Sequence, residues 1–311
     1  MPVTVLAIGG NSLIRSKERS SFADQLATVA ETMQPVAGLV RAGSEVVITH
    51  GNGPQVGFLL IRSHLSRQRL PEIPLDACGA ETQAEIGYMI QQALGNEFRR
   101  SGVKKGVATV VTQVLVDEQD PAFKSPSKPV GPFYTKNEAA ALEKDLGWTM
   151  REDAGRGFRR LVASPRPVEV VEQAQVEALL ARGTVVVACG GGGIPVVRRK
   201  GALEGIAAVI DKDLASSLLA ARLRAERLVI STAVERVFLS YGKPQQRGLD
   251  RVSAREMQEY LAAGEFPSGS MGPKVEAALE FLAAGGKEVI ITDPEHLGEA
   301  IEGRAGTTIG P

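Results

Sequence analysis

The chain has 311 residues, with 36 Lys and Arg against 36 Asp and Glu, so its formal charge is zero. This length is sufficient for one large α/β core or two smaller ones. A neutral balance predicts no overall attraction to nucleic acid or to an anionic membrane. No apolar run reaches about 18 residues, so we expect no membrane span. The N-terminus also lacks the charged region of a signal peptide.

The first part of the chain predicts a βαβ unit. Residues 3–8 form a β-branched run that ends at a glycine pair. From residue 22 to residue 39 the apolar positions follow a helical period, and Gly43 marks the end of the helix. Residues 45–49 predict a second strand, which ends at another glycine-rich turn. Units of this kind build parallel sheets with helices on their faces.

The alternation of strands and helices continues toward the C-terminus, with two interruptions. Residues 117–134 are rich in Pro, Lys and Ser and predict a long loop, and residues 148–162 predict a β-hairpin. Because long loops in compact proteins usually serve a function, the excursion over residues 117–166 is a candidate lid. Elsewhere we expect helices at residues 82–99, 172–181, 212–223 and 274–284, and strands at residues 107–116, 184–188, 227–231 and 287–292.

Three glycine clusters fall at the predicted carboxyl ends of strands. They are Gly9-Gly10, Gly51-Asn52-Gly53 and residues 190–193. Open parallel sheets bind ligands at this edge, and glycine lets backbone N–H groups approach an anion closely. Taken singly, a glycine pair after a strand is only a tight turn in roughly two cases out of three. The agreement of three clusters favours one phosphate-rich site.

Several common motifs do not occur in the sequence. There is no G-x-x-x-x-G-K-[ST] phosphate loop and no G-x-S-x-G elbow. The glycines of residues 51–57 miss the dinucleotide-binding spacing by one residue. His50, His64 and His296 are scattered, so we interpret each as a surface or hydrogen-bonded structural residue. Cys78 and Cys189 are too far apart to suggest a disulfide framework or a zinc site, which is typical of a cytoplasmic protein.

Three lysines are candidates for binding an anion, and none is decisive alone. Lys212 lies between Asp211 and Asp213 before an apolar helix, where the acids could be ordinary caps and the lysine a solvated charge. Lys128 lies in the expected long loop, where exposure to water is the default. Lys274 lies at an expected helix start, where a cation is unfavourable for the helix dipole, and this is a weak hint of another purpose.

Over essentially its whole length the chain resembles the carbamate kinases of the amino-acid-kinase superfamily. The segments IGGNSL and HGNGPQVG at residues 8–13 and 50–57 would indicate only the superfamily, whereas KPVGPFY at 128–134 and DKD at 211–213 are more specific to carbamate kinases. Further matching segments are residues 75–80, 112–114, 163–167, 189–195, 208–213 and 271–275.

The resemblance implies a fold and a reaction. The fold would be a three-layer αβα sandwich with an open, mainly parallel central sheet and an inserted lid-like subdomain at about residues 117–166, within one domain of residues 1–311. The reaction would be reversible phosphoryl transfer between ATP and carbamate, giving ADP and carbamoyl phosphate with Mg²⁺. In fermenting microbes it commonly makes ATP, in arginine metabolism. Members are usually homodimers.

The resemblance also implies an acceptor side in the N-terminal half and a nucleotide side in the C-terminal half. Lys128 would reach toward carbamate and the transferring phosphoryl group. Lys212 and Lys274 would lie on the ATP phosphates, and Asp213 would orient these lysines and the water shell of a metal whose ligands stay unassigned. The carbamate site would be lined by Gly9, Gly10, Asn11, Gly51, Asn52 and Gly53, and the nucleotide side by Thr232, Ala233, Val234 and Met271.

Some residues depart from the family pattern. Ser12 replaces a frequent Ala, Glu235 replaces a shorter acid found in related kinases, and Glu81-Thr82 stands where apolar or variable residues are expected. These departures affect the fine shape of the site rather than the reaction class.

Two alternatives remain open. The first is a superfamily kinase that acts on acetylglutamate, a uridine nucleotide or a small phosphate monoester, and residues 128–134 argue against it. The second is a non-catalytic nucleotide- or anion-binding protein on the same scaffold. The joint presence of Lys128, Lys212, Asp213 and Lys274 argues against this second alternative.

Overall fold

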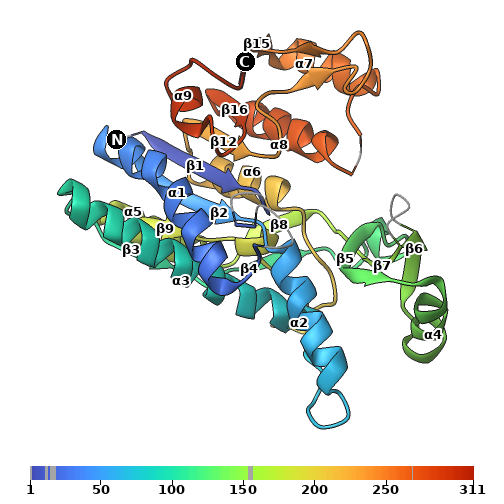
Figure 1. Ribbon diagram of the computed structural model, residues 1–311. Coiled ribbons are helices and arrows are strands. Elements are labelled where there is room, and N and C mark those ends of the chain that lie inside the picture. Colours follow the sequence, from blue (N-terminus) through green and yellow to red (C-terminus); the bar gives the residue numbers. More distant parts are fainter. Residues whose placement is uncertain (1, 11–12, 15–18, 153–156, 268) are drawn as a thin grey trace.

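An eight-stranded sheet forms the centre of the computed structural model, which describes residues 2–10, 13–14, 19–152, 157–267 and 269–311 (Figure 1). Every pairing in this sheet is parallel except that of β16 with β17, so the predicted mainly parallel sheet is confirmed. Its strands, in spatial order, are β15 (Arg251–Ser253), β17 (Thr307–Gly310), β16 (Glu288–Thr292), β12 (Arg227–Ser231), β1 (Val3–Ile8), β2 (Glu45–His50), β9 (Val185–Val187) and β3 (Val107–Thr109).

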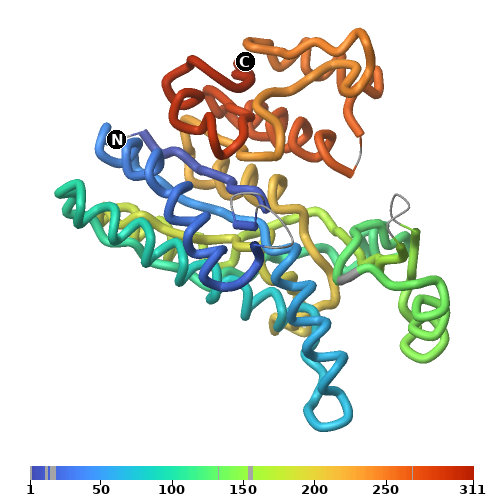
Figure 2. Tube along the Cα trace, viewed as in Figure 1, coloured from blue at the N-terminus to red at the C-terminus, as the bar shows by residue number. Residues whose placement is uncertain are grey.

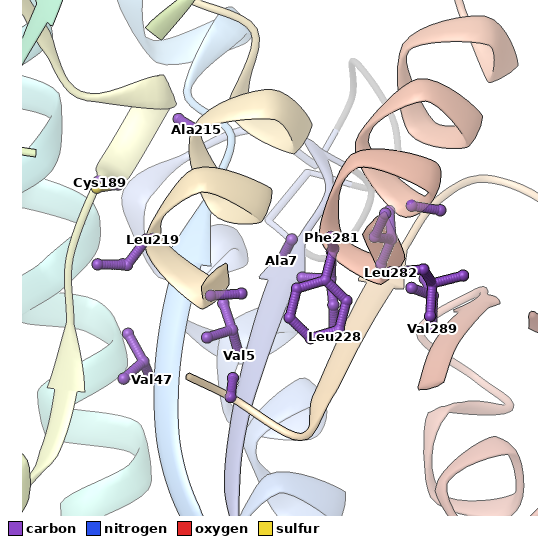
Figure 3. Packing of buried hydrophobic residues seen from close by; sticks show 14 of the residues in the cluster. Val5, Ala7, Val47, Cys189, Ala215, Leu219, Leu228, Phe281, Leu282 and Val289 are labelled. Atoms are coloured by element: carbon purple, nitrogen blue, oxygen red, sulfur yellow. The ribbon is translucent and has the colours of Figure 1, made fainter. Parts of the chain in front are cut away.

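Helices cover both faces of this sheet, because the central strands are apolar on both sides. Along β1, Val5 and Ala7 belong to the core on one face, and Leu6 and Ile8 belong to the core on the other. The first core packs under α5 (Gln173–Ala181), α6 (Lys212–Arg222), α7 (Ala254–Ala262) and α8 (Met271–Ala283), and Figure 3 shows it near α6 and α8. The second packs under α1 (Phe22–Arg41), α3 (Leu75–Ser101) and α9 (Leu297–Ile301). The expected three-layer αβα sandwich is confirmed.

Most predicted elements occur close to their expected positions. The strand at residues 227–231 and the helix start at Phe22 are correct, and Gly43 has a left-handed φ of 95° where the first helix was expected to stop. Two helices begin earlier than expected, α3 at Leu75 and α8 at Met271. Among the described helices, none combines the length and the apolar character that a bilayer-spanning helix requires.

The single strand predicted over residues 107–116 is wrong, since the chain breaks there and enters a second sheet. Gln83 lies at the break: its amide nitrogen donates to the Thr112 carbonyl at 3.0 Å, and its amide oxygen accepts the Thr112 N–H at 2.7 Å. The Thr112 carbonyl also accepts the Ile194 N–H at 2.9 Å, so the backbone leaves its pairing with β9 here and continues beside residues 194–199. The second sheet contains, in spatial order, β11 (Ala202–Gly205), β10 (Ile194–Arg199), β4 (Gln113–Val116) and β8 (Pro167–Val170).

The long loop predicted over residues 117–134 is wrong for its second half. After a short 3-10 turn at Pro121–Phe123, residues Lys128–Tyr134 form the strand β5. Pro129 made this stretch look like a loop, but β5 is an edge strand, where a missing N–H donor is tolerated. β5 pairs with β7 (Phe158–Val162), which pairs with β6 (Thr149–Glu152), as expected for a hairpin. The hairpin turn at residues 153–156 lies outside the described residues.

These strands and α4 (Lys136–Leu146) form what we call the small subdomain, which projects from the sandwich (Figure 2). It is joined to the sandwich through α2 (Gly53–Ser66), which packs against β5. Gly131 of β5 lies so close to α2 that a Cβ on Gly57 would be 3.6 Å from its Cα. Because α2 starts directly after β2, the small subdomain is held close to the carboxyl edge of the central sheet.

Gly87 allows α3 to pack closely on β3, and its replacement tests this contact. A Cβ at Gly87 would lie 2.9 Å from the Cβ of Thr109, so Gly87→Ala should lower the free energy of unfolding by about 1–3 kcal/mol through overpacking. Gly95→Ala on the same helix meets nothing within 4 Å and should stabilise the protein by up to about 1 kcal/mol. Urea unfolding measures both, and equal effects would contradict the close packing.

Candidate functional site

The carboxyl ends of β1, β2 and β12 lie side by side and form the floor of the candidate site. In the strand register Ile8 is opposite His50, and Ala7 is opposite Ile230. The turn after β1 touches the end of β12, because a Cβ on Gly9 would be 2.7 Å from the Ser231 carbonyl oxygen. The Gly51 N–H donates to the Ile8 carbonyl at 3.0 Å. The first two glycine clusters are therefore adjacent, as expected for one site.

Asp213 lies between two lysines at the entrance to α6. One carboxylate oxygen accepts a hydrogen bond from Lys212, and the other lies 3.1 Å from Nζ of Lys274 on α8. The Asp213 side chain is only 3% exposed, and those of Lys212 and Lys274 are 14% and 16% exposed. Three of the four expected charged residues thus form one contact cluster, built from two helices that are separated in the sequence.

The charges of this cluster determine its protonation. Burial would raise the pKa of Asp213, but the ammonium groups of Lys212 and Lys274 outweigh burial and lower this pKa to about 2. Burial lowers the pKa of Lys212, and the carboxylate of Asp213 opposes that effect. Two ammonium groups around one carboxylate leave one positive charge without a partner. The cluster therefore favours an anionic ligand.

The stem of Lys212 passes along the second glycine turn. A Cβ on Gly51 would be 3.5 Å from Cδ of Lys212 and 3.8 Å from the backbone N of Gly10. The lysine therefore lies where the turns after β1 and β2 meet. Ser216, one turn further along α6, fixes this helix on the sheet, because its hydroxyl lies 2.6 Å from that of Thr49 in β2.

Lys128 approaches the same helix from the small subdomain. Its Nζ lies 2.8 Å from a carboxylate oxygen of Asp211, whose other oxygen caps α6 by accepting the Asp213 N–H at 2.9 Å. Asp211 is two residues from Asp213 along the chain, so Lys128 lies near the Asp213 cluster, but its contact is with Asp211. The expected loop position of Lys128 is wrong, because this residue lies on β5. Its side chain stays partly exposed but is held in an ion pair.

The third glycine cluster supports the site from beneath rather than facing solvent. Residues 190–193 are buried, and Gly191 adopts a left-handed φ of 67°. A Cβ on Gly191 would lie 2.7 Å from Oδ1 of Asn52, so only glycine allows the Asn52 side chain to pack there. The amide of Asn52 donates to the Thr82 hydroxyl at 2.9 Å. The third cluster thus contacts the second through Asn52, but its own residues are buried.

Two polar residues of α3 that support the site were not identified from the sequence. The Thr82 hydroxyl accepts a hydrogen bond from the Asn52 amide. The Gln83 amide nitrogen donates both to the Thr112 carbonyl and, at 3.0 Å, to the Gly190 carbonyl. Both are buried on the stripe of α3 that faces the sheet. Polar side chains on such a stripe need partners, and this was the available signal. Thr82, a departure from the family pattern, is thus a buried support of Asn52.

The residues expected along the nucleotide lie around the end of β12 and the start of α8. The Thr232 N–H donates to the Thr292 carbonyl at 2.7 Å, and Ala233 and Val234 continue the chain from there. Met271 starts α8 three residues before Lys274, so the two share one helical turn. Asn11 and Ser12 lie outside the described residues, so the role expected of Asn11 stays a prediction.

Within the described ranges, no three His, Cys, Asp or Glu side chains are close enough to hold a metal ion. Both carboxylate oxygens of Asp213 are already bound by lysines. Mg²⁺ commonly binds to one or two carboxylates, water and substrate phosphates rather than to an all-protein cage. The residues present therefore fit a magnesium ion that arrives on a nucleotide.

Comparison with known proteins gives consistent results. The model of the amino acid kinase family matches residues 2–293. A carbamate kinase of Thermococcus kodakarensis is 46% identical, and the match covers 99% of each chain. A carbamate kinase-like protein of Escherichia coli, YahI, is 49% identical, over 99% of this chain and 98% of its own. The solved structure of Giardia lamblia carbamate kinase bound to AMP-PNP has a TM-score of 0.93 and 42% identity, over 99% of this chain and 98% of its own.

His50 gives the site a testable pH dependence. It is fully buried, its Nδ1 lies 3.0 Å from the Gly51 carbonyl, and its Nε2 has no hydrogen-bond partner among the described residues. Burial lowers the pKa of His50 from 6.5 to about 4. The stability that depends on neutral His50 is thus fully present above pH 6.5 and is lost as the pH falls toward 4.

We expect this loss to reach about 3 kcal/mol of unfolding free energy. His50→Gln cannot take up a proton, so the difference in unfolding free energy between the native protein and the variant should shrink as the pH falls from 7 to about 4.5. Urea titrations at several pH values measure this difference. Parallel pH profiles for the two proteins would contradict a buried neutral His50.

Proposed function

Because the chain belongs to the carbamate kinases of the amino acid kinase family, we propose that it catalyses reversible phosphoryl transfer between ATP and carbamate, giving ADP and carbamoyl phosphate. The observation that carries this proposal is the pair of lysines held by Asp213 where the glycine turns after β1 and β2 meet. That arrangement combines fixed positive charge with closely approachable backbone N–H groups. Both are what a transferring phosphoryl group requires.

The chemistry explains why charge is the main need. Carbamate is already an anion, so its attacking oxygen needs no general base. The difficulty is to bring it up to the anionic γ-phosphate, where the repulsion is on the order of a few kcal/mol at a screened effective dielectric. Ammonium groups and aimed N–H donors offset this repulsion, most strongly where charge spreads over the equatorial oxygens of the transition state.

We assign the nucleotide side to the C-terminal half of the chain. Lys212 and Lys274 bind the ATP phosphates, and Asp213 holds both ammonium groups in position. Thr232, Ala233, Val234 and Met271 border the nucleotide. Mg²⁺ enters with the nucleotide and neutralises phosphate charge when bound. Because its oxygens are occupied by lysines, Asp213 reaches the metal through water.

We assign the acceptor side to the N-terminal half. Backbone groups of the turns after β1 and β2 bind carbamate, and the residues proposed are Gly9, Gly10, Asn11, Gly51, Asn52 and Gly53. Lys128 brings a further positive charge from the small subdomain. In this proposal residues 117–166 act as a lid, and its closure excludes water from carbamate and carbamoyl phosphate, which are labile in water.

We further propose a cytoplasmic homodimer that functions in arginine metabolism. Cys78 and Cys189 are both free and buried, which suits a reducing compartment. Phe22 of α1 and Tyr88 of α3 stack with ring centroids 6.1 Å apart while 42% and 51% exposed. An exposed aromatic pair suits a surface that is covered by a second copy of the chain.

A different small acceptor is the second candidate function. One specific observation favours it: the relative with 49% identity is described only as carbamate kinase-like. A kinase with the same nucleotide side could thus serve another small acid or phosphate.

A reverse-direction assay tests the proposed reaction. Purified protein, ADP, Mg²⁺ and carbamoyl phosphate should form ATP, followed by luciferase, and removal of Mg²⁺ with a chelator should abolish it. No ATP from a folded protein that binds ADP would exclude carbamoyl phosphate as the phosphoryl donor. Acetyl phosphate in place of carbamoyl phosphate then tests for another acceptor.

Replacement of Lys128 tests its assigned role. Lys128→Ala should lower kcat by about 100-fold or more, because a charge next to the transferring group is lost. Lys124→Ala, an exposed lysine of the segment before β5, should retain full kcat. The free energy of unfolding should fall by only about 1 kcal/mol in Lys128→Ala, since its ion pair is partly exposed. Turnover at the native rate in Lys128→Ala would remove this residue from the mechanism.

A further inference from the structure

A cavity of about 330 Å³ lies between the small subdomain and the sandwich, away from the Asp213 cluster. Its sandwich side is formed by α2 and the start of α3, and its subdomain side includes Trp148 and Arg160. Ser63 of α2 lies ten residues beyond Gly53, which places it about 15 Å along the helix from the glycine turn. The volume is within the range of small-molecule sites. The cavity is therefore separate from the proposed catalytic centre.

Arg160 brings a positive charge to this cavity without an acidic partner in contact. Its guanidinium carbon lies 4.3 Å from the centroid of the Trp148 ring, a cation–π contact that holds the group in place. Among the described residues the guanidinium of Arg160 has no hydrogen bond and no ion pair, and burial lowers its pKa, although the Glu72 carboxylate opposes this effect. A half-buried guanidinium has five N–H donors and strongly favours a carboxylate partner.

His64 contains a second donor without an acceptor. Nη1 of Arg67 lies 3.1 Å from Nε2 of His64, and arginine can only donate, so Nε2 accepts this bond. In the neutral ring the proton therefore resides on Nδ1. Nδ1 is buried and has no partner among the described residues. The His64 ring thus lines the cavity, but its N–H group without an acceptor is covered by protein.

The other residues of the cavity wall determine which ligand fits beside the charged group. The hydroxyl oxygen of Ser63 accepts the Ile73 N–H at 2.9 Å, which leaves its own proton available for donation. Leu60, Ile73, Pro74 and Leu75 supply apolar walls. Glu72, which is exposed, also lines the cavity, and its carboxylate offsets part of the positive charge of Arg160. The lining thus suits one anionic group attached to a compact apolar body.

We propose that this cavity is a second binding site, for a small organic monocarboxylate that pairs with Arg160 and accepts from the hydroxyl of Ser63. The ligand would contact both the sandwich and the small subdomain. Arg160 lies on β7 opposite Val130 of β5, and Lys128 lies two residues away on that strand. Occupancy therefore fixes the strand that carries Lys128 relative to α2. This coupling to turnover rests on the proposed function, whereas the binding itself does not.

Trp148 is the only tryptophan of the chain and lines the cavity, so its fluorescence reports binding directly. Benzoate is the probe, and benzamide, which has the same shape without the charge, is its control. Benzoate should change the emission of Trp148 in a saturable way, and benzamide should not. A response to benzamide equal to that to benzoate would overturn the proposed carboxylate site.

Variants assign the response to this cavity. Arg160→Gln should weaken benzoate binding by about tenfold or more, as expected for loss of a charged hydrogen-bond partner. Arg151→Gln, an exposed arginine on the neighbouring strand β6, should bind benzoate like the native protein. Lys128→Ala should also bind it, because that lysine belongs to the other site. Equal affinity in Arg160→Gln, or loss of the response in Lys128→Ala, would overturn the proposal.

Two further measurements keep binding separate from folding and from catalysis. The unfolding midpoint of Arg160→Gln in urea should stay close to that of the native protein, and Arg160→Lys should restore part of the benzoate affinity. With the native enzyme, saturating benzoate should change the KM for carbamoyl phosphate, and this change should disappear in Arg160→Gln. A KM effect of the same size in both proteins would place benzoate at the catalytic centre and overturn the second site.

Discussion

The ion cluster of Asp213 with Lys212 and Lys274 is the interaction on which the rest of the site depends. A carboxylate that is 3% exposed is stable as a charge only if cations stay beside it. These cations come from α6 and α8, which pack together on the central sheet. The sandwich therefore fixes two ammonium groups at the strand ends before any ligand arrives. Such preorganisation is the main source of electrostatic stabilisation in phosphoryl transfer.

Around that cluster the backbone lies very close to other backbone segments and to side chains, and this explains why glycines occur at these positions. Gly9 touches the carbonyl of Ser231, Gly51 lies against the stem of Lys212, and Gly191 makes room for Asn52. Each position joins a different pair of elements. The floor of the site thus consists mainly of backbone, and its charged side chains come from helix starts and from the edge strand of the small subdomain.

Sequence patterns correctly predicted the elements whose conformation depends mainly on their own residues. The alternation along β1 and the helical stripe of α1 are local, and both elements formed as expected. The predictions that failed concern residues whose conformation depends on partners that are distant in the sequence. The pairing of β5 with β7 makes residues 128–134 a strand despite Pro129. The break within residues 107–116 involves Gln83, which is 29 residues from Thr112, and pairing with residues 194–196. The same limit applies to the site, where lysines could be named from the resemblance but the supports of Asn52 and Gly51 could not.

The ion pair between Lys128 and Asp211 affects how a substrate would be bound and released. Under the proposed mechanism, an anion that takes Lys128 must displace the carboxylate that already neutralises it. Binding is then an exchange of counter-ions, and the free energy gained is the difference between two similar ion pairs rather than the whole of one. Such an exchange keeps the affinity for either anion moderate. It also makes release of the product easier, because Asp211 stays close enough to form the ion pair with Lys128 again.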